Sequence, residues 1–147
     1  MSAENVELIR RVYERFNRLG RLDPAEVDAA EMVPEVWNNL DPEFELVQPD
    51  YLPDASIFHG ADGAQRFLRT IGDIWIEVRW EPEEFVDAGD AVLVRARLVG
   101  LARRGGAPFE TDETGVWRFR DGRIVRLEGF RDYGEARAAV GLEPEGS

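Results

Sequence analysis

Apolar residues in the first third of the chain recur at steps of three and four, which is the period of an amphipathic helix. The first stripe runs from Val6 to Leu19 and stops at Gly20, so we expect a helix there. The tetrapeptide 23–26 (Asp-Pro-Ala-Glu) supplies a cap, a proline suited to the first helical position and a glutamate three residues past the cap. It predicts a second helix, which Pro34 divides or restarts.

A short strand, an irregular stretch and a third helix are expected next. The strand covers 44–48, and the irregular stretch covers 49–61 and contains the single histidine, His59. From Asp62 onward, apolar residues at helical spacing predict a helix that reaches Trp75.

The rest of the chain changes to the period of two that is typical of strands. Glycine and aspartate cluster at the breaks, which favours hairpin turns. The expected strands cover residues 76–86, 91–102, 108–120 and 123–131. Asp132 begins a last short helix as its cap, and residues 143–147 are expected to be disordered. We therefore expect one domain over residues 1–142.

Alternation along the strands gives one apolar and one charged face, as in an antiparallel sheet covered by helices on one side. The apolar set includes Val78, Val94, Trp117, Val125 and Leu127. The pattern predicts an α+β fold, in which a curved antiparallel sheet wraps around the N-terminal helices as a cone. Both signs of charge alternate on the other face, which is either a solvated surface or the interface of a homodimer. We expect the homodimer.

Composition narrows the class of partners. The chain has 147 residues, 18 basic and 30 acidic side chains, a net charge of −12 and no cysteine. A surface with this much negative charge repels phosphate backbones and anionic membranes. We therefore expect neither nucleic acid nor a membrane as a partner. Without a membrane span or signal peptide in the sequence, a cytoplasmic location is expected. With no thiolate and one histidine, we expect no metal and no cofactor.

Three segments carry a resemblance to a known family. They are the last hairpin (115–126), its continuation (130–136) and the loop-to-helix stretch 58–63. Together with the order of elements, they resemble the nuclear-transport-factor-2-like fold, and within it the SnoaL-like group named for a polyketide cyclase. The resemblance implies a cone with one small-molecule pocket inside, and it extends over roughly residues 6–142.

The resemblance implies fold more firmly than activity. The superfamily includes ketosteroid isomerases, limonene-epoxide hydrolases, scytalone dehydratases and polyketide cyclases, as well as non-catalytic binding modules. The isomerase acid falls on Gly115 here, and the acids and arginine of the epoxide hydrolases fall near Ala96, Leu98 and Gly129. These particular activities are therefore not expected.

Glu113 is the acidic side chain on the apolar face of the predicted meander. A carboxyl group there must find a partner, shift its pKa upward or face a wet cavity, and a shifted carboxyl suits a general acid or base. The alternative is a salt bridge near the strand end, or a bulge that turns it outward. His59 and Tyr13 are further catalytic candidates, each with an alternative structural role. Arg131 has the same inward parity as Val125 and Leu127, so it can neutralise Glu113 or hold a substrate oxygen, or it can form a rim ion pair.

Four tryptophans suit the walls of an apolar pocket for a ring-bearing ligand, although a small core also needs such residues. They are Trp37, Trp75, Trp80 and Trp117. Two hypotheses remain open. The chain is a cofactor-free enzyme of the cyclase, isomerase or hydratase type that acts on a small apolar substrate, or it is a non-catalytic ligand-binding or dimerisation module.

Overall fold

A computed structural model describes residues 2–48 and 57–143 of the chain. In chain order its elements are α1 (Ser2–Asn17), the 3₁₀ turn η1 (Pro24–Glu26), α2 (Ala29–Met32), α3 (Pro34–Trp37), β1 (Leu40–Val47), β2 (Ile57–His59), α4 (Gly60–Ile74), β3 (Trp75–Asp87), β4 (Ala91–Ala102), β5 (Pro108–Arg120), β6 (Arg123–Phe130) and α5 (Tyr133–Ala139). The predicted tail beyond 143 and part of the irregular stretch, 49–56, lie outside the described residues.

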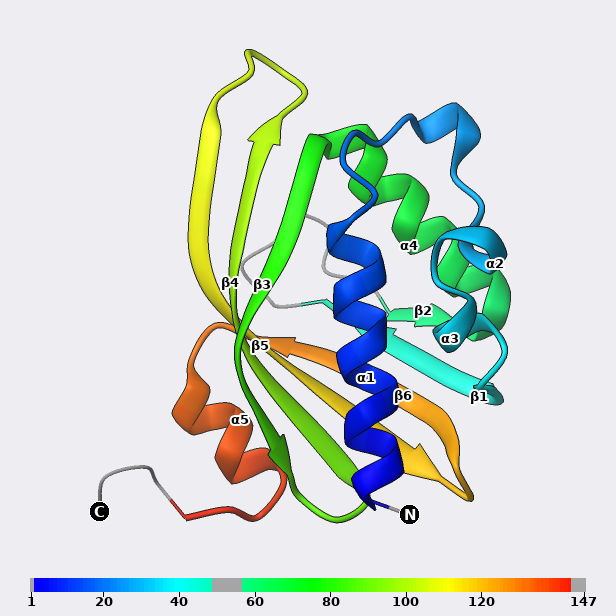
Figure 1. Cartoon of the computed structure of the whole chain (residues 1–147), viewed down its shortest axis with the longest axis vertical. Helices are drawn as coiled ribbons and strands as arrows, with labels where there is room; N and C mark the ends of the chain where they lie inside the picture. The colour runs from blue at the N-terminus through cyan, green and yellow to red at the C-terminus, as the bar shows by residue number, and fades with distance from the viewer. Residues whose placement is uncertain (1, 49–56, 144–147) are drawn as a thin grey trace.

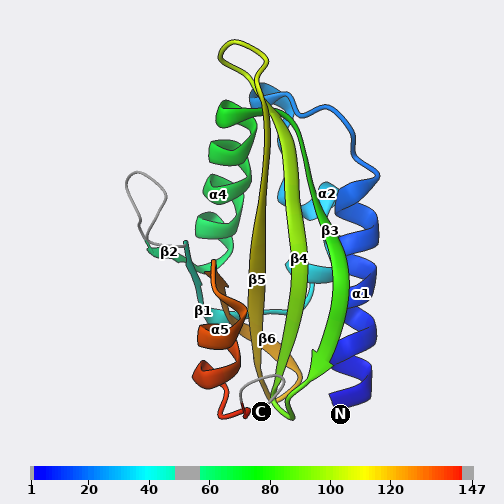
Figure 2. The same ribbon diagram turned by 90° about the vertical axis from the view of Figure 1, so that its left-hand side faces the viewer.

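The six strands form one open sheet in the order β2-β1-β6-β5-β4-β3. The meander from β3 to β6 is antiparallel, as predicted, but β1 lies parallel to β6 and makes the sheet mixed. Helices α1 to α4 cover the inner face of the curved sheet, and α5 packs on the opposite face (Figures 1 and 2). The predicted α+β cone with a short C-terminal helix is confirmed.

The first helix forms as the apolar stripe predicts. Its inner side buries Ile9, Val12, Tyr13 and Phe16 against the sheet. Gly20, at a φ of 71°, takes the left-handed conformation that glycine adopts without steric cost, so the chain turns away there.

The predicted second helix is instead three short pieces. The Asp23 side chain accepts a hydrogen bond from the Ala25 amide, but this cap starts only the turn η1. The Asp28 side chain then caps α2, and Pro34 begins α3. A second acidic cap and a proline that cannot donate a hydrogen bond therefore interrupt the helix twice.

Strand β3 and the hairpin of β5 and β6 contain bulges that the alternation does not reveal. One extra residue in a strand reverses which side chains face inward beyond it, and it bends the sheet. In the hairpin, Arg118 pairs with Arg126, and the next residue of β5, Phe119, pairs with Ile124. Val125 lies between these two partners on β6 and is therefore the extra residue. Ile124 is fully buried, so the inward position predicted for Val125 is wrong.

The outer face of the sheet is less polar than predicted. Helix α5 packs Ala136 against Leu93 and Val116, which are both fully buried. The Asp132 side chain caps this helix by accepting from the amides of Gly134 and Glu135, which confirms its predicted role. The homodimer expected through the outer face stays a prediction, and α5 occupies part of that face.

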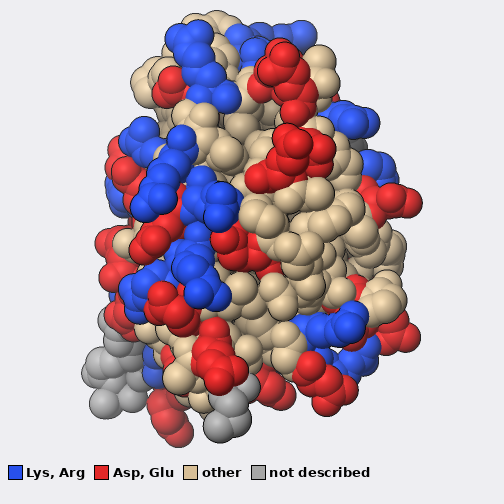
Figure 3. All heavy atoms as spheres, turned by 45° about the vertical axis from the view of Figure 1, so that its right-hand side comes forward, with Lys and Arg blue, Asp and Glu red and all other residues tan. Residues whose placement is uncertain are grey.

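The visible charge distribution agrees with the composition. On the face in Figure 3, arginine side chains are interspersed with aspartate and glutamate rather than forming a continuous basic field. Within residues 2–48 and 57–143, no helix has the length and apolar character that a membrane span needs.

Candidate functional site

A cavity of about 840 Å³ lies between the inner face of the sheet and the helices. Its size falls within the range of small-molecule sites in proteins. The wall comes from α1, α3, α4 and the strands β1 to β6, so the fold as a whole creates it. The aliphatic and phenylalanine side chains of the wall are Val12, Phe16, Val33, Val36, Phe44, Leu46, Val47, Phe58, Ala64, Phe67, Leu68, Ile71, Ile74, Leu98, Phe109 and Leu127.

Two apolar side chains of the cavity wall are exposed to solvent. Ile74 at the end of α4 and Phe109 near the start of β5 both line the cavity and are exposed to 45% and 39%. Trp75 stacks against Phe109 with 5.1 Å between ring centroids. Exposed apolar side chains are costly to keep in water, so their position at the cavity suits an entrance for an apolar molecule.

Each tryptophan of the cavity wall is held by an aromatic neighbour. Trp80 packs edge-to-face on Phe16 at 5.2 Å, and Trp117 packs on Tyr13 at 6.1 Å. The Asn17 side chain also exchanges two hydrogen bonds with the Trp80 backbone, at 2.8 and 3.0 Å. These contacts fix the flat walls before any ligand arrives, which lowers the entropy cost of binding.

The buried end of the cavity carries a polar pair. The Trp117 Nε1–H donates a hydrogen bond of 3.1 Å to the Tyr13 hydroxyl oxygen. Gly115 lies under this pair, and a Cβ atom there would come within 2.8 Å of that hydroxyl. The sequence position where the isomerase pattern has its acid is thus the place where the Tyr13 hydroxyl approaches the strand.

Burial raises the pKa of the Tyr13 phenol well above its usual range, and the charge of Glu113 raises it further. The hydrogen bond from Trp117 opposes this shift without cancelling it. The phenol therefore keeps its proton at neutral pH. Since Trp117 already donates to the oxygen, the Tyr13 O–H remains a hydrogen-bond donor.

Glu113 lines the cavity from β5 and is half-buried. It lies two residues before Gly115 and four before Trp117 on the same face of the strand. Its effect on the pKa of Tyr13 shows that the carboxylate and the phenol are within electrostatic range. The cavity thus combines a carboxylate with a protonated phenol.

The structure brings together five of the eight predicted site residues. Glu113, Tyr13, Trp75, Trp80 and Trp117 line the cavity. The other three, Trp37, His59 and Arg131, are not in its wall.

These three residues are held elsewhere by their elements. Trp37 ends α3 and packs on the edge of the core. His59 is exposed at the end of β2, opposite Glu45, and precedes the first turn of α4. Arg131 is exposed and follows the last residue of β6, so the alternation that places Leu127 and Gly129 at the cavity ends before it. Their functional roles stay predictions.

Most of the aliphatic wall was not predicted from the sequence. The stripe on the third helix, which includes Phe67 and Ile71, was the available signal, since the inner side of that helix must face the sheet. Phe58 and Leu46 gave no such signal, because they reach the cavity through the short pairing of β2 with β1.

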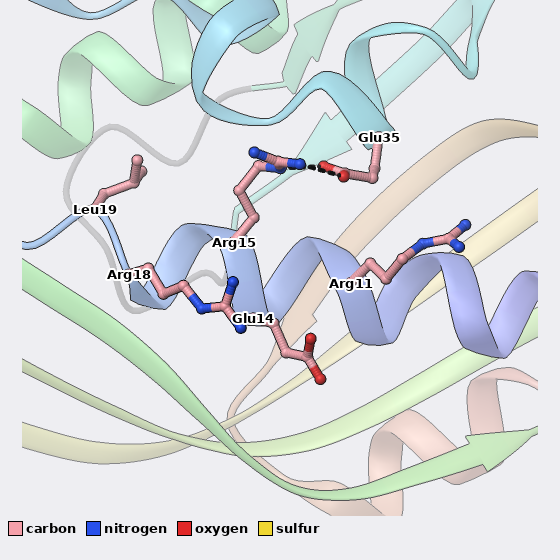
Figure 4. Close-up of a pocket in the computed structure, with 6 residues that line it drawn as sticks. All are labelled: Arg11, Glu14, Arg15, Arg18, Leu19 and Glu35. Atoms are coloured by element: carbon pink, nitrogen blue, oxygen red, sulfur yellow. Dashed lines mark hydrogen bonds and ion pairs between the residues drawn. The ribbon is translucent and has the colours of Figure 1, made fainter.

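A second hollow of about 320 Å³ lies outside α1 and has a charged wall. It is lined by Arg11, Glu14, Arg15, Arg18, Leu19 and Glu35 (Figure 4). The Arg15 guanidinium donates two hydrogen bonds of 2.7 and 3.0 Å to the Glu35 carboxylate, which lowers the pKa of Glu35. This pair joins α3 to α1, so we assign the hollow to the packing of helices over the cavity.

The described part of the chain contains no group of three or more histidine, aspartate or glutamate side chains that could hold a metal ion. All 18 basic residues of the chain are arginines, so a lysine Schiff base is not available to the site. The polar groups that the cavity wall offers are a carboxylate, a phenol, indole N–H groups, the amide of Gln48 and the hydroxyl of Thr70.

Comparisons with known proteins place the chain in a family. A family model described as the SnoaL-like domain matches residues 9–127, and the chain belongs to this family. No curated protein gave a match.

Solved structures similar to the chain are NTF2-like proteins. One from Burkholderia thailandensis has 27% identity and a TM-score of 0.70, covering 95% of this chain and 97% of its own. One of unknown function from Burkholderia pseudomallei has 25% identity and a TM-score of 0.69, with 94% and 98% covered. A putative SnoaL-like polyketide cyclase from Jannaschia sp. has 18% identity and a TM-score of 0.68, with 97% and 94% covered.

Proposed function

We propose that this SnoaL-like protein binds a small, apolar, ring-bearing molecule in its cavity and acts on it by acid–base chemistry without a cofactor. The observation that carries the proposal is the cavity itself. It encloses about 840 Å³, its wall is almost wholly apolar and aromatic, and Glu113 and Tyr13 share its interior. A mainly apolar cleft with a few convergent polar groups is the usual form of a small-molecule site.

Glu113 is the proposed general base. A carboxylate in an apolar enclosure can take a proton from an acidic carbon or hydroxyl of the ligand and return it at another atom. The Tyr13 O–H would donate to the ligand oxygen that gains negative charge, and the Trp117 N–H on the same phenol supports that charge. Isomerisation and cyclisation can proceed through such proton transfers, and hydration needs in addition a water molecule that the base activates.

Non-catalytic binding is the second candidate. One observation favours it: the strand position that carries the acid in isomerase-like relatives is Gly115, and the Tyr13 hydroxyl occupies the space beside it. In this case the same cavity holds a ligand, and Glu113 contributes only a hydrogen bond.

Binding is tested by thermal shift with a panel of polycyclic aromatics, steroids and terpenoids. A ligand that binds only the folded protein raises the melting temperature in a saturable way. We expect at least one chemical class to do so. The matched control is Ala64→Phe, which fills part of the cavity wall from α4 and should abolish the shift. An absence of saturable shifts across the panel would contradict the proposal.

Catalysis is tested with Glu113→Gln, which removes the charge and keeps the shape of the side chain. For a ligand that is converted, we expect turnover to fall by about 10²–10⁴-fold while affinity changes little. Unchanged turnover in Glu113→Gln would remove Glu113 from the mechanism. Binding without conversion of any tested ligand would favour the non-catalytic candidate.

A further inference from the structure

The exposed part of the cavity wall lies where α4 passes into β3. Ile74 ends α4 and Trp75 begins β3, and both line the cavity together with Phe109 of β5. Ile74 and Phe109 are exposed, whereas Trp75 is half-buried. A molecule that enters here would therefore meet the Trp75 indole between the solvent and the interior.

The Trp75 ring reaches across one strand to make its contact. Phe109 belongs to β5, and β4 lies between β5 and β3 in the sheet. Gly100 of β4 pairs with Phe109, and a Cβ atom added at Gly100 would come within 3.1 Å of the Trp75 ring. Glycine thus leaves the space that the ring occupies. Trp75 packs against Phe109 there, with 5.1 Å between ring centroids and 46° between ring planes.

Arg103 fixes the backbone that carries Trp75. Its amide donates a hydrogen bond of 2.9 Å to the oxygen of Ile74. Its guanidinium donates to the backbone oxygens of Gly72, Leu22 and Trp75, at 3.0, 2.5 and 3.1 Å. The oxygens of Gly72 and Ile74 belong to the last turn of α4, where carbonyl groups lack partners within the helix.

One arginine therefore ties the end of α4 and the start of β3 to the β4–β5 hairpin. These three segments lie at the same end of the molecule (Figures 1 and 2). Arg103 is not among the described residues that line the cavity, so it acts on a ligand only through the residues that it holds.

An aromatic ring held in this way discriminates between ligands of the same size. Two aromatic rings in an offset or edge-to-face arrangement gain stabilisation beyond the burial of their area, equivalent to about two- to tenfold in affinity. A saturated ring buries a similar area but has no π-system to contribute. Because the indole is already fixed, little of this gain is lost to ordering it on binding.

We propose that Trp75 determines specificity at the exposed part of the cavity wall, where it favours aromatic over saturated ring systems, and that Arg103 is the positioning residue that holds the indole in place. This inference rests on the proposed function, because it names the class of ring that the same cavity admits. It is independent of whether the ligand reacts.

The test compares 2-naphthol with decahydro-2-naphthol, which has the same carbon skeleton in saturated form. Dissociation constants are measured at pH 7 by calorimetry on the full chain. The readout is the selectivity ratio, the dissociation constant of the saturated probe divided by that of the aromatic one, because a general loss of stability does not change it. In Trp75→Leu we expect this ratio to fall by about threefold or more. Trp75→Phe keeps an aromatic ring and should retain most of the ratio.

The positioning role is tested at Arg103 with the same ratio. Arg103→Met should lower it, and Arg103→Lys, which can still donate to backbone oxygens, should restore at least part of it. The control is Arg104→Met, which removes an equal charge from the exposed neighbour in the same turn and should leave the ratio unchanged. Circular dichroism melting verifies that each variant is folded. If Trp75→Leu does not fold, Phe109→Leu replaces it, since this exposed ring is the one that Trp75 contacts.

An unchanged ratio in Trp75→Leu and Phe109→Leu would overturn the role of Trp75 and leave the proposed function intact. A lowered ratio in Trp75→Leu with none in Arg103→Met, or equal effects in Arg103→Met and Arg104→Met, would overturn the positioning role of Arg103. Failure of both probes to bind the wild type would instead overturn the proposed function, and this inference with it.

Discussion

Trp117 donates its indole N–H to the hydroxyl oxygen of Tyr13 over 3.1 Å, although the two residues are 104 positions apart in the chain. The bond joins the first helix to the middle of the sheet at the buried end of the cavity. Both side chains are buried, so neither polar group can find water as a substitute. Stability and the geometry of the site therefore depend on the same contact.

Replacing Tyr13 with phenylalanine should destabilise the protein by about 1–3 kcal/mol, because the Trp117 N–H is left buried without its acceptor. Urea unfolding of Tyr13→Phe, Trp117→Phe and the double variant measures the effect. The double variant should be more stable than the sum of the single effects predicts. Strict additivity would show that the two groups do not interact.

The raised pKa of Tyr13 predicts a loss of stability in alkali. The unfolded phenol ionises near pH 10, whereas the folded one does not, so its contribution is complete below pH 10 and falls as the pH rises above that value. Each pH unit above 10 should remove about 1.4 kcal/mol. Unfolding free energies from pH 9 to 11.5 should fall more steeply for the wild type than for Tyr13→Phe. The variant keeps Tyr51 and Tyr133, and the pKa of Tyr133 is also raised, mainly by burial. Parallel curves would contradict the assignment.

Gly115→Ala is predicted to be destabilising for steric reasons alone. The φ of this glycine is not in the left-handed region, but the new Cβ would lie 2.8 Å from the Tyr13 hydroxyl and 3.3 Å from Trp117 Nε1. Overpacking of this kind costs about 1–3 kcal/mol. The same substitution in a Tyr13→Phe background should cost less, since the nearest atom is gone. An equal loss of unfolding free energy in both backgrounds would show that the new Cβ does not clash with the Tyr13 hydroxyl.

The Gln65 side chain joins α4 to the backbone between η1 and α2. It accepts from the Ala29 amide and donates to the Val27 carbonyl, both at 2.7 Å. Gln65→Met keeps the size but leaves two backbone groups without partners, so we expect a loss of about 1–3 kcal/mol in urea unfolding. Arg69→Met, an exposed change on the same helix, is the control and should be close to neutral. Similar losses of unfolding free energy in both variants would mean that a methionine on α4 is destabilising in itself and that the two hydrogen bonds of Gln65 are not the cause.

Local patterns predicted most of the elements correctly. The stripe of α1 and the alternation in the meander follow from periods of 3.6 and 2, which any short window of the sequence contains. The turns at 87–90 and 121–122 were also predictable, because glycine and aspartate favour tight hairpins. Glu113, Tyr13 and three tryptophans were found because these patterns assign them to inner faces.

Other features depend on contacts between distant segments. The parallel pairing of β1 with β6 and the short β2 are set by the whole sheet rather than by their own residues. The bulge at Val125 adds one residue to β6 and reverses which side chains face inward on its two sides, and no residue type in the sequence marks it. Gly115 did carry a signal, because glycine inside a central strand often marks a close approach of another group.

The most direct test of the central claim follows the four indole N–H signals in a ¹H–¹⁵N correlation spectrum while 2-naphthol is added. Single Trp→Phe variants assign the signals. Trp75, Trp80 and Trp117 line the cavity, whereas Trp37 does not and serves as an internal control. We predict that the first three signals shift with one common dissociation constant and that the signal of Trp37 stays in place. Unmoved signals, or a shift confined to Trp37, would contradict a ligand-binding cavity.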